Sequence, residues 1–313
     1  MTVKPSVTNQ QINSIIVDEN SFDYLYVYYL MRTLEEKIKS LGKNATAVPI
    51  LNKTKFSNIE ISIFEDIERQ KAISSILSAY DDLIENNQKQ IKLLEEAAQR
   101  LYKEWFVDLR FPGYENTPIV DGVPEGWEKV PLSELISYEI GGGWGEEYPT
   151  AKNTKKAYVI RGTDLYGITH GDLLSIPFRF HAESNLLPRN LIDGDIVFEV
   201  SGGSRTEGVA RCLLITSAML EAWKNNVMCA SFCKLIRPKN GCSYYLHDCF
   251  KYMRSTGKTE EYDKRSASSI VNYRWKDFLA QEVLLKPTAE MLDRKNSYAN
   301  GLYSKVSSCS LQI

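Results

Sequence analysis

The longest regular pattern in the chain is a stripe of mostly apolar residues between Ile73 and Trp105. Successive members are separated by alternating steps of four and three residues, which is the 3.5-residue period of a coiled-coil face. No proline or glycine interrupts the segment, and charged residues such as Asp81 and Lys92 lie off the stripe. We therefore predict one continuous helix over residues 66–106, within a spacer segment of residues 65–110. The stripe, called the seam below, consists of Ile73, Leu77, Tyr80, Ile84, Asn87, Ile91, Leu94, Ala98, Leu101 and Trp105.

A helix of this length needs a partner. At roughly 50 Å, it cannot bury its apolar stripe against itself and requires a second long helix, from the same chain or from another. Asn87 places a polar side-chain amide within the otherwise mostly apolar seam. It either fixes the register of helix pairing at some cost in stability, or it is a solvated surface residue. We favour the register role, because the seam directs Asn87 inward.

The pattern changes after the helix. Pro112 and Gly113 are stop signals, and residues 121–127 form a turn-rich linker. From there to residue 285, short β-rich runs alternate with clusters of Gly, Asp, Asn and Ser. We predict a compact mixed domain, mostly β, over residues 111–287, and hence an α+β fold with a long coiled-coil-like helix. The predicted strands lie within residues 157–160, 196–200, 209–215 and 229–236.

Similar residues recur at a constant offset of 222 positions. Each copy has a helix-like aromatic run, then a polar loop, then a short apolar strand, and a further helix begins after it. Chance similarity of two such stretches is the alternative, but the shared register favours a genuine repeat. The matched pairs are Met31-Arg32 with Met253-Arg254, Ala45-Thr46 with Ala267-Ser268, Phe56 with Phe278, Glu60 with Glu282, Ile61 with Val283, and Ile63 with Leu285.

Composition limits the partners and the compartment. The net charge of −2 gives no overall support for binding to nucleic acid, so any DNA-binding charge must be gathered locally. We find no apolar run of transmembrane length and no signal peptide, and we expect a cytoplasmic protein. The six cysteines do not have the spacing of a paired zinc site, and we expect reduced thiols, no metal and no cofactor.

Candidate enzyme motifs are incomplete. Residues 255–259 imitate the end of a phosphate-binding loop, but the required earlier glycine is replaced by Tyr252. Glu35-Glu36-Lys37 is half of a nuclease motif, and surface ion pairing explains it better. No Asn/Asp-Pro-Pro-aromatic motif of a methyltransferase is present. We therefore expect that the chain itself is not an enzyme.

Several stretches resemble the specificity (S) subunits of type I restriction–modification enzymes. The resemblance is most specific in the central helix, and it continues through the domain that follows. The matching stretches are Ser78-Ala79-Tyr80-Asp81-Asp82-Leu83-Ile84-Glu85-Asn86-Asn87, residues 93–108, Phe111-Pro112-Gly113, Pro124-Glu125-Gly126-Trp127, Val159-Ile160-Arg161-Gly162-Thr163-Asp164-Leu165 and residues 190–197.

The resemblance implies a non-catalytic DNA-recognition subunit. Members of this family carry two target-recognition domains, each of which reads one half of a bipartite site in double-stranded DNA. Two antiparallel helices separate these domains. Methyltransferase (M) subunits dock on the S subunit, and a motor–nuclease (R) subunit joins for cleavage, so catalysis belongs to partners.

The chain departs from the family pattern. On this interpretation, residues 1–64 are the C-terminal fragment of a first recognition domain, and residues 65–110 are the central conserved helix. Residues 111–287 are a complete recognition domain, and residues 288–313 begin a distal conserved helix that is truncated. We therefore expect a half-length form, for which a homodimer through the long helix would restore two recognition domains. The alternative function is a protein-interaction or decoy module that competes for methyltransferase subunits.

Three loops carry side chains suited to DNA. Phosphate contacts need Lys, Arg or small hydroxyl residues, and base contacts in the major groove need Arg, Lys, Asn or Gln. The glycine-rich stretch 141–145 is either a simple turn or a close approach to DNA that exposes Trp144. Arg161 and Asp164 are expected to form an internal ion pair. The predicted DNA-contacting residues are Trp144, Lys152, Asn153, Lys155 and Lys156 in the first loop, Ser204 and Arg205 in the second, and Lys258, Lys264 and Arg265 in the third.

Overall fold

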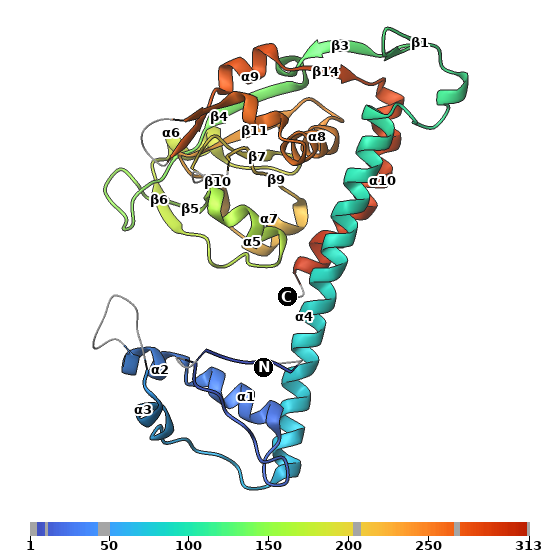
Figure 1. Cartoon of the computed structure of the whole chain (residues 1–313). Coiled ribbons are helices and arrows are strands. Elements are labelled where there is room, and N and C mark those ends of the chain that lie inside the picture. The colour runs from blue at the N-terminus through green and yellow to red at the C-terminus, as the bar shows by residue number, and fades with distance from the viewer. Residues whose placement is uncertain (1–4, 10–11, 43–50, 203–207, 266–269, 312–313) are drawn as a thin grey trace. The chain divides into compact units, whose positions relative to one another are not determined.

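The structure is a computed structural model that describes residues 5–9, 12–42, 51–202, 208–265 and 270–311. The chain forms two compact units, residues 1–85 and 86–313, and the boundary between them lies within one long helix, α4 (Figure 1). No helix in the described ranges is long and apolar enough to cross a membrane.

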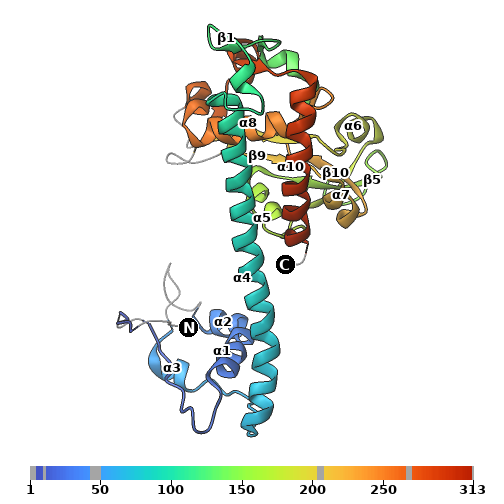
Figure 2. The same cartoon turned by 90° about the vertical axis from the view of Figure 1, so that its right-hand side faces the viewer.

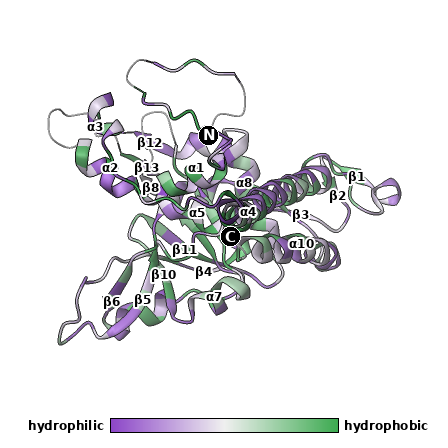
Figure 3. Cartoon of the chain, turned by 90° about the horizontal axis from the view of Figure 1, so that it is seen from below, coloured by the Kyte–Doolittle hydropathy of each residue, from purple (hydrophilic) through white to green (hydrophobic). Residues whose placement is uncertain are grey.

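Helix α4 extends over Ile67–Tyr102 and passes through Asn87 without a break. A short π-helix continues it over Lys103–Val107, and the chain then turns at Leu109, which has a positive φ of 58°. The predicted continuous helix over residues 66–106 is therefore confirmed. Viewed along its axis, α4 carries both hydrophobic and hydrophilic residues, as expected of an amphipathic helix (Figure 3).

In the first unit, a buried glutamine fixes the start of α4. The side chain of Gln70 is fully buried; its Oε1 accepts a hydrogen bond from the Asp23 amide (2.8 Å), and its Nε2 donates one to the Phe64 carbonyl (2.6 Å). The Asp23 carboxylate caps α1 by accepting from the amide of Tyr26. These hydrogen bonds pair the backbone groups at the start of α1 and just before α4. Its other helices are α1 (Tyr24–Thr33), α2 (Glu35–Gly42) and α3 (Lys53–Ser57).

The second unit is built around a four-stranded antiparallel sheet with the order β4–β11–β7–β9. All four side chains of β7 are buried, which means that both faces of the sheet are covered. The strands are β4 (Ile136–Gly141), β11 (Cys233–Pro238), β7 (Ile196–Glu199) and β9 (Cys212–Leu214).

Smaller sheets surround the central one. In the sheet of order β10–β5–β6, β10 is parallel to β5, whereas the other strand pairings are antiparallel. The strands are β10 (Asn226–Cys229), β5 (Lys155–Ile160) and β6 (Phe178–His181); β12 (Asp263–Arg265), β13 (Val271–Tyr273) and β8 (Ser201–Gly202); β14 (Val283–Lys286) and β3 (Glu128–Pro131); and β1 (Ile119–Val120) and β2 (Val123–Pro124).

Helices cover the sheets of this unit, so the fold is the expected α+β arrangement of a mixed domain with a long helix. The helices are α5 (Leu165–Thr169), α6 (Glu183–Leu186), α7 (Ser217–Trp223), α8 (Ser243–Ser255), α9 (Trp275–Gln281) and α10 (Ala289–Ser310). The 3₁₀ segments are Tyr114–Asn116, Leu132–Leu135, Gly162–Asp164, Leu187–Arg189 and Lys258–Tyr262.

One predicted strand is wrong. The run 229–236 divides into the end of β10 and the start of β11, because a turn closes between them with a hydrogen bond from the Cys233 amide to the Ala230 carbonyl (2.8 Å). Phe232 is exposed in this turn. Of the other three predicted runs, 157–160 lies within β5, and 196–200 and 209–215 contain β7 and β9.

An aromatic cluster forms the core beneath the central sheet. Phe198 of β7 packs against Phe250 of α8, Tyr273 of β13, and Trp275 and Phe278 of α9, with ring centroids 5.2–5.9 Å apart. Aromatic pairs at such distances contribute beyond the area they bury. The cluster therefore connects β7 of the central sheet with α8, β13 and α9.

A buried polar network connects α8, α10 and α4. Asp248 and Lys295 are both fully buried and form an ion pair at 2.5 Å. Asp248 also accepts a hydrogen bond from the Tyr303 hydroxyl, which lies 2.9 Å from Nδ1 of His247, and Gln99 of α4 donates to the Asp248 carbonyl at 3.3 Å. Burial alone acts to raise the pKa of Asp248, but Lys295 and His247 outweigh it and hold that pKa below its usual value.

Helix α10 lies antiparallel to the C-terminal half of α4 (Figure 2). Val306 and Cys309 pack against Ile91, and Tyr298 contacts Trp105 edge-on at 5.7 Å. The seam is therefore covered from Asn87, which is 3% exposed, to Trp105. In contrast, Leu77 and Tyr80 are exposed, so α10 shields part of the seam, as predicted.

The repeat extends to the secondary structure. Helices α3 and α4 begin at residues 53 and 67, and α9 and α10 begin at residues 275 and 289, so both pairs differ by 222. Helix α1 likewise corresponds to α8. The first copy lacks the predicted strand, because residues 58–64 form no β-structure, whereas β14 of the second copy pairs with β3. The matches Ala45-Thr46 and Ala267-Ser268 lie outside the described residues.

We predict that Asp248→Asn destabilises the protein by about 3–5 kcal/mol, because it leaves the Lys295 ammonium buried without its counter-ion. The double variant Asp248→Leu, Lys295→Met should be much less destabilised, since no buried charge remains. Urea unfolding of the full chain measures both. A single variant of near wild-type stability, or a double variant as unstable as the single one, would show that the ion pair has no such role.

Candidate nucleic-acid interface

Three loops of the second unit meet at one edge of the central sheet. The amides of Gly142 and Gly143, after β4, donate to the carbonyls of Cys233 (2.9 Å) and Cys229 (3.0 Å). After β7, the amides of Val200 and Ser201 both donate to the Phe232 carbonyl. The start of the first predicted loop and the start of the second are therefore held against the same 229–233 turn.

The third predicted loop joins this edge through the sheet β12–β13–β8. Lys264 lies opposite Asn272, and Asn272 lies opposite Ser201, whose hydroxyl donates to the Asn272 Oδ1 at 2.9 Å. Directly opposed residues share a face of a sheet, and Lys264 and Asn272 are exposed. These three side chains, called the polar row below, thus form a continuous polar surface. The sequence analysis missed Asn272, because the short strand β13 in which it lies carries no recognisable motif.

The structure separates the predicted cations by their partners. Lys152 and Lys264 are exposed and have no ion pair among the described residues. Lys155 pairs with Glu183 at 3.6 Å, and Lys156 lies over the ring of Phe180. Lys152 and Lys264 are therefore free to contact a phosphate, whereas Lys155 and Lys156 are already engaged.

The remaining predicted residues also differ. Lys258 pairs with Glu261 (3.1 Å) and Glu282 (3.7 Å), and the hydrogen bond to Glu261 contributes most to raising its pKa. Arg265 lies 3.7 Å from Asp263. Ser204 and Arg205 lie outside the described residues. The acidic partners of these cations lie far away in the sequence or across a turn. The sequence alone therefore could not show which lysines and arginines are already paired.

The glycine-rich stretch approaches the protein's own backbone. A Cβ on Gly142 would lie 2.2 Å from the Ala230 carbonyl oxygen, and Gly145 has a φ of +74°. Trp144, between these glycines, is 41% exposed, and the Arg179 guanidinium lies 4.8 Å from its ring centroid. The close approach at Gly142 therefore serves the fold, and it presents Trp144 at the surface.

Beside Trp144 is a polar cavity of about 390 Å³. His181, at the end of β6, is 2% exposed, and its Nε2 has no hydrogen-bond partner among the described residues. Burial is the main cause that lowers the pKa of His181, so the ring is neutral at pH 7. The cavity combines predicted residues with others that the sequence analysis missed, and it is lined by Trp144, Gly145, Glu146, Lys152, Asn153, His181, Ala182, Ser184, Asn185 and Arg189.

Other charged groups maintain the shape of this region. Arg189 is held by the backbone, since its guanidinium donates to the carbonyls of Gly141 (2.9 Å) and Asn185 (3.0 Å). Arg161 and Asp164 form the expected internal ion pair at 2.7 Å. These residues are therefore structural supports and do not offer charge to a ligand.

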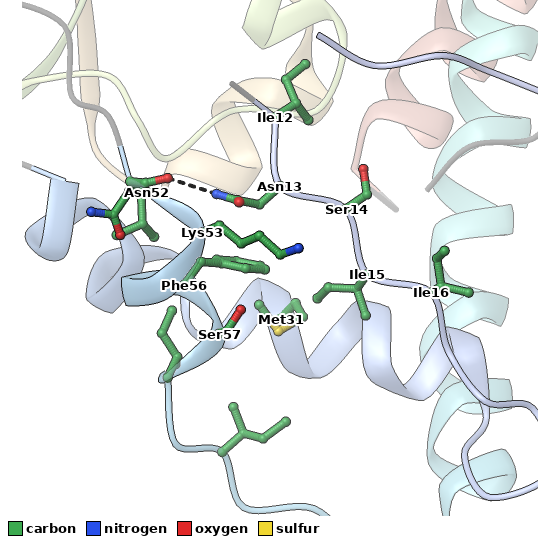
Figure 4. A pocket seen from close by; sticks show the side chains of 13 residues that line it. Ile12, Asn13, Ser14, Ile15, Ile16, Met31, Asn52, Lys53, Phe56 and Ser57 are labelled. Atoms are coloured by element: carbon green, nitrogen blue, oxygen red, sulfur yellow. Dashed lines mark hydrogen bonds between the residues drawn. The ribbon is translucent and has the colours of Figure 1, made fainter. Parts of the chain in front are cut away.

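A larger cavity, of about 770 Å³, lies in the first unit (Figure 4). Met31, Phe56 and Ile15 line it, and the Asn13 side-chain amide spans its edge to the Leu51 carbonyl. Met31 and Phe56 correspond in the repeat to Met253 and Phe278, which are buried in the core of the second unit. This cavity has a mixed polar and apolar lining, and none of its lining residues is a predicted DNA-contacting residue.

No cluster of three or more potential metal-binding side chains occurs within the described ranges. The cysteines there are free thiols. Glu35 and Glu36 form surface ion pairs, as expected, since Lys39 bridges Glu35 (2.8 Å) and Glu36 (3.1 Å).

Comparison with known proteins gives consistent matches. A family model described as "Type I restriction modification DNA specificity domain" matches residues 1–96. The type I restriction enzyme MjaIX specificity subunit of Methanocaldococcus jannaschii is 32% identical over 162 residues, which is 50% of this chain and 37% of that protein. The type I restriction enzyme HindI specificity subunit of Haemophilus influenzae is 48% identical over 62 residues, which is 20% of this chain and 14% of that protein.

A solved structure shares the fold. The S subunit of the type I restriction–modification system from M. genitalium superposes with a TM-score of 0.53 at 12% identity, over 94% of this chain and 69% of that chain. The matched region spans well under half of each curated relative. These matches agree with the helix motifs found in the sequence: the chain is similar in sequence to type I restriction–modification specificity subunits, and it shares the fold of a solved S subunit.

Proposed function

We propose that this chain recognises a sequence in double-stranded DNA as the specificity subunit of a type I restriction–modification complex. The observation that carries the proposal is the convergence of the three predicted loops at one edge of the central sheet. This edge exposes Lys152, Lys264, Asn272 and Trp144. Unpaired lysines suit phosphates, and amides suit base edges. Such local charge compensates for a net charge of −2.

We further propose that partner subunits perform the catalysis. Methyltransferase subunits would transfer the methyl group, and a motor–nuclease subunit would cleave DNA. This chain would determine which DNA sequence the complex acts on, a role that fits a surface with hydrogen-bonding groups and no recognised catalytic motif.

The test is the pattern of DNA methylation in the host cell. Deleting the gene should abolish methylation at one sequence motif, and restoring it should return that motif. Affinity purification of the tagged chain should recover a methyltransferase subunit. Unchanged methylation after deletion would contradict the proposal.

The polar row and the third loop generate a specific prediction. The double variant Lys264→Ala, Arg265→Ala should weaken DNA binding for all sequences alike, because phosphate contacts carry no sequence information. The dependence of log K on log salt should become shallower by about one for each phosphate that is no longer neutralised. Binding of the complex to duplex DNA at several salt concentrations measures both effects.

Lys129→Ala, on β3, is the matched control and should leave the binding unchanged. Arg205→Ala in the second loop should also reduce affinity, by about 1–3 kcal/mol if it contacts a base. If affinity and salt dependence were wild type in both loops, neither loop would contact DNA.

We also propose that α4 pairs with a second copy of the chain or with a methyltransferase subunit. Ile76, Tyr80 and Leu83 are 41–63% exposed and lie on the face of α4 that, further along, packs against α10. An exposed apolar stripe of this kind favours association. In a homodimer, a two-fold axis perpendicular to the helices would make them antiparallel and the DNA site palindromic.

The seam variant Leu94→Asp would test association poorly, because Leu94 packs within the chain, near Ile91, Val306 and Cys309. Ile76→Asp introduces a charge on the exposed stripe, so it should abolish dimerisation without unfolding the chain. Sedimentation velocity of the purified chain measures this. Ser75→Asp, on the neighbouring position off the stripe, should leave the dimer intact. A wild-type chain that sediments as a stable monomer would refute the homodimer.

A further inference from the structure

We propose that the cavity beside Trp144 binds a single nucleobase that is turned out of the DNA duplex. Trp144 would provide the stacking surface, and the amides of Asn153 and Asn185, with the imidazole of His181, would provide the hydrogen-bonding groups. The inference rests on the proposed function, because it assigns one base of the recognised sequence to a defined pocket.

Two side-chain amides on the cavity lining are available to a ligand. The side-chain amides of Asn153 and Asn185 have no hydrogen bond among the described residues, although the two backbone amides do. Each amide offers a donor and an acceptor, which is the pattern that the edge of a base requires.

The buried imidazole strengthens this assignment. His181 Nε2 is withdrawn from water and has no partner in the described part of the chain, a state that costs free energy unless a ligand satisfies it. The backbone at Gly145 lies against this nitrogen, since a Cβ there would be 2.7 Å from Nε2. Because the Gly145 backbone covers Nε2, a base would contact His181 only after a local change at residues 143–145, whereas the amides of Asn153 and Asn185 need no such change.

The shape and charge of the cavity suit a base better than a phosphate or a metal ion. A volume of about 390 Å³ is in the range of small-molecule sites. Lys152 lies on the lining and can contact the backbone phosphate of the base, while Glu146, also on the lining, can accept from an exocyclic amino group. Arg189 is held by the Gly141 and Asn185 carbonyls. A mixed lining with an exposed aromatic ring is typical of pockets for flipped bases.

The experiment uses the full chain, tagged and purified from its host cell with the proteins that remain bound. Selection from a randomised duplex library first defines the preferred site. Each base pair of that site is then replaced in turn by a mismatch. A base that must leave the duplex binds more tightly when it is mispaired, because less pairing energy is given up.

We expect one position at which a mismatch increases the affinity by about fivefold or more. In the double variant Asn153→Ala, Asn185→Ala, that increase should disappear and the preference at that position should relax, while affinity for random DNA stays unchanged. Both side chains lie outside the core, so the variant should fold, which thermal unfolding checks. Asn116→Ala, an exposed asparagine outside the cavity, is the matched control and should behave as wild type.

The possible results separate the two proposals. A wild-type protein that selects a motif but shows no mismatch-enhanced position overturns the base pocket and leaves the specificity function standing. A double variant that retains both the enhancement and the full preference also overturns the pocket. A wild-type protein that selects no motif overturns the proposed function and the pocket with it.

Discussion

The arrangement of the second unit depends on one buried ion pair, between Asp248 of α8 and Lys295 of α10. Two charges removed from water are tolerated because each is satisfied by close partners. Tyr303, His247 and the side chain of Gln99 complete the hydrogen bonds, so the network connects α8 to both α10 and α4. A slip of α10 by one turn would separate these groups, and hence the network specifies a single register where apolar packing alone would allow several.

That register also determines the positions of the residues at the edge of the central sheet that is proposed to contact DNA. The aromatic cluster around Phe198 transmits the position of α8 to β7 and β13. These strands lead to Ser201 and Asn272 of the polar row, and the 229–233 turn leads to Trp144. The residues proposed to contact DNA thus lie on or next to paired strands, and the packing of β7 against α8 and α9 fixes the position of those strands. Such preorganisation favours specificity, because binding then restricts little remaining freedom.

The sequence predicted the parts of the structure that follow from local periodicity. The seam predicted α4, and the 222-residue offset predicted the correspondence of α4 with α10 and of Phe56 with Phe278, although the helices α3 and α9 that carry these two residues were not predicted. Properties set by distant partners could not be predicted. Lys155 and Lys258 resemble Lys152 and Lys264 in sequence, and only the fold brings Glu183 or Glu282 beside the first two. His181 lies 37 residues after Trp144 and carries no motif, and the 229–236 run has no proline or glycine to mark its internal turn.

The pairing of β3 with β14 has a consequence for how such proteins diversify. It joins residues 128–131 to residues 283–286, so the chain enters and leaves the mixed domain between α4 and α10 at neighbouring points. A domain whose two ends meet can be exchanged as a cassette without altering the helices that carry it. Under the proposed function, genetic recombination near the end of α4 and the start of α10 would change the DNA sequence that is recognised and leave both helices unchanged.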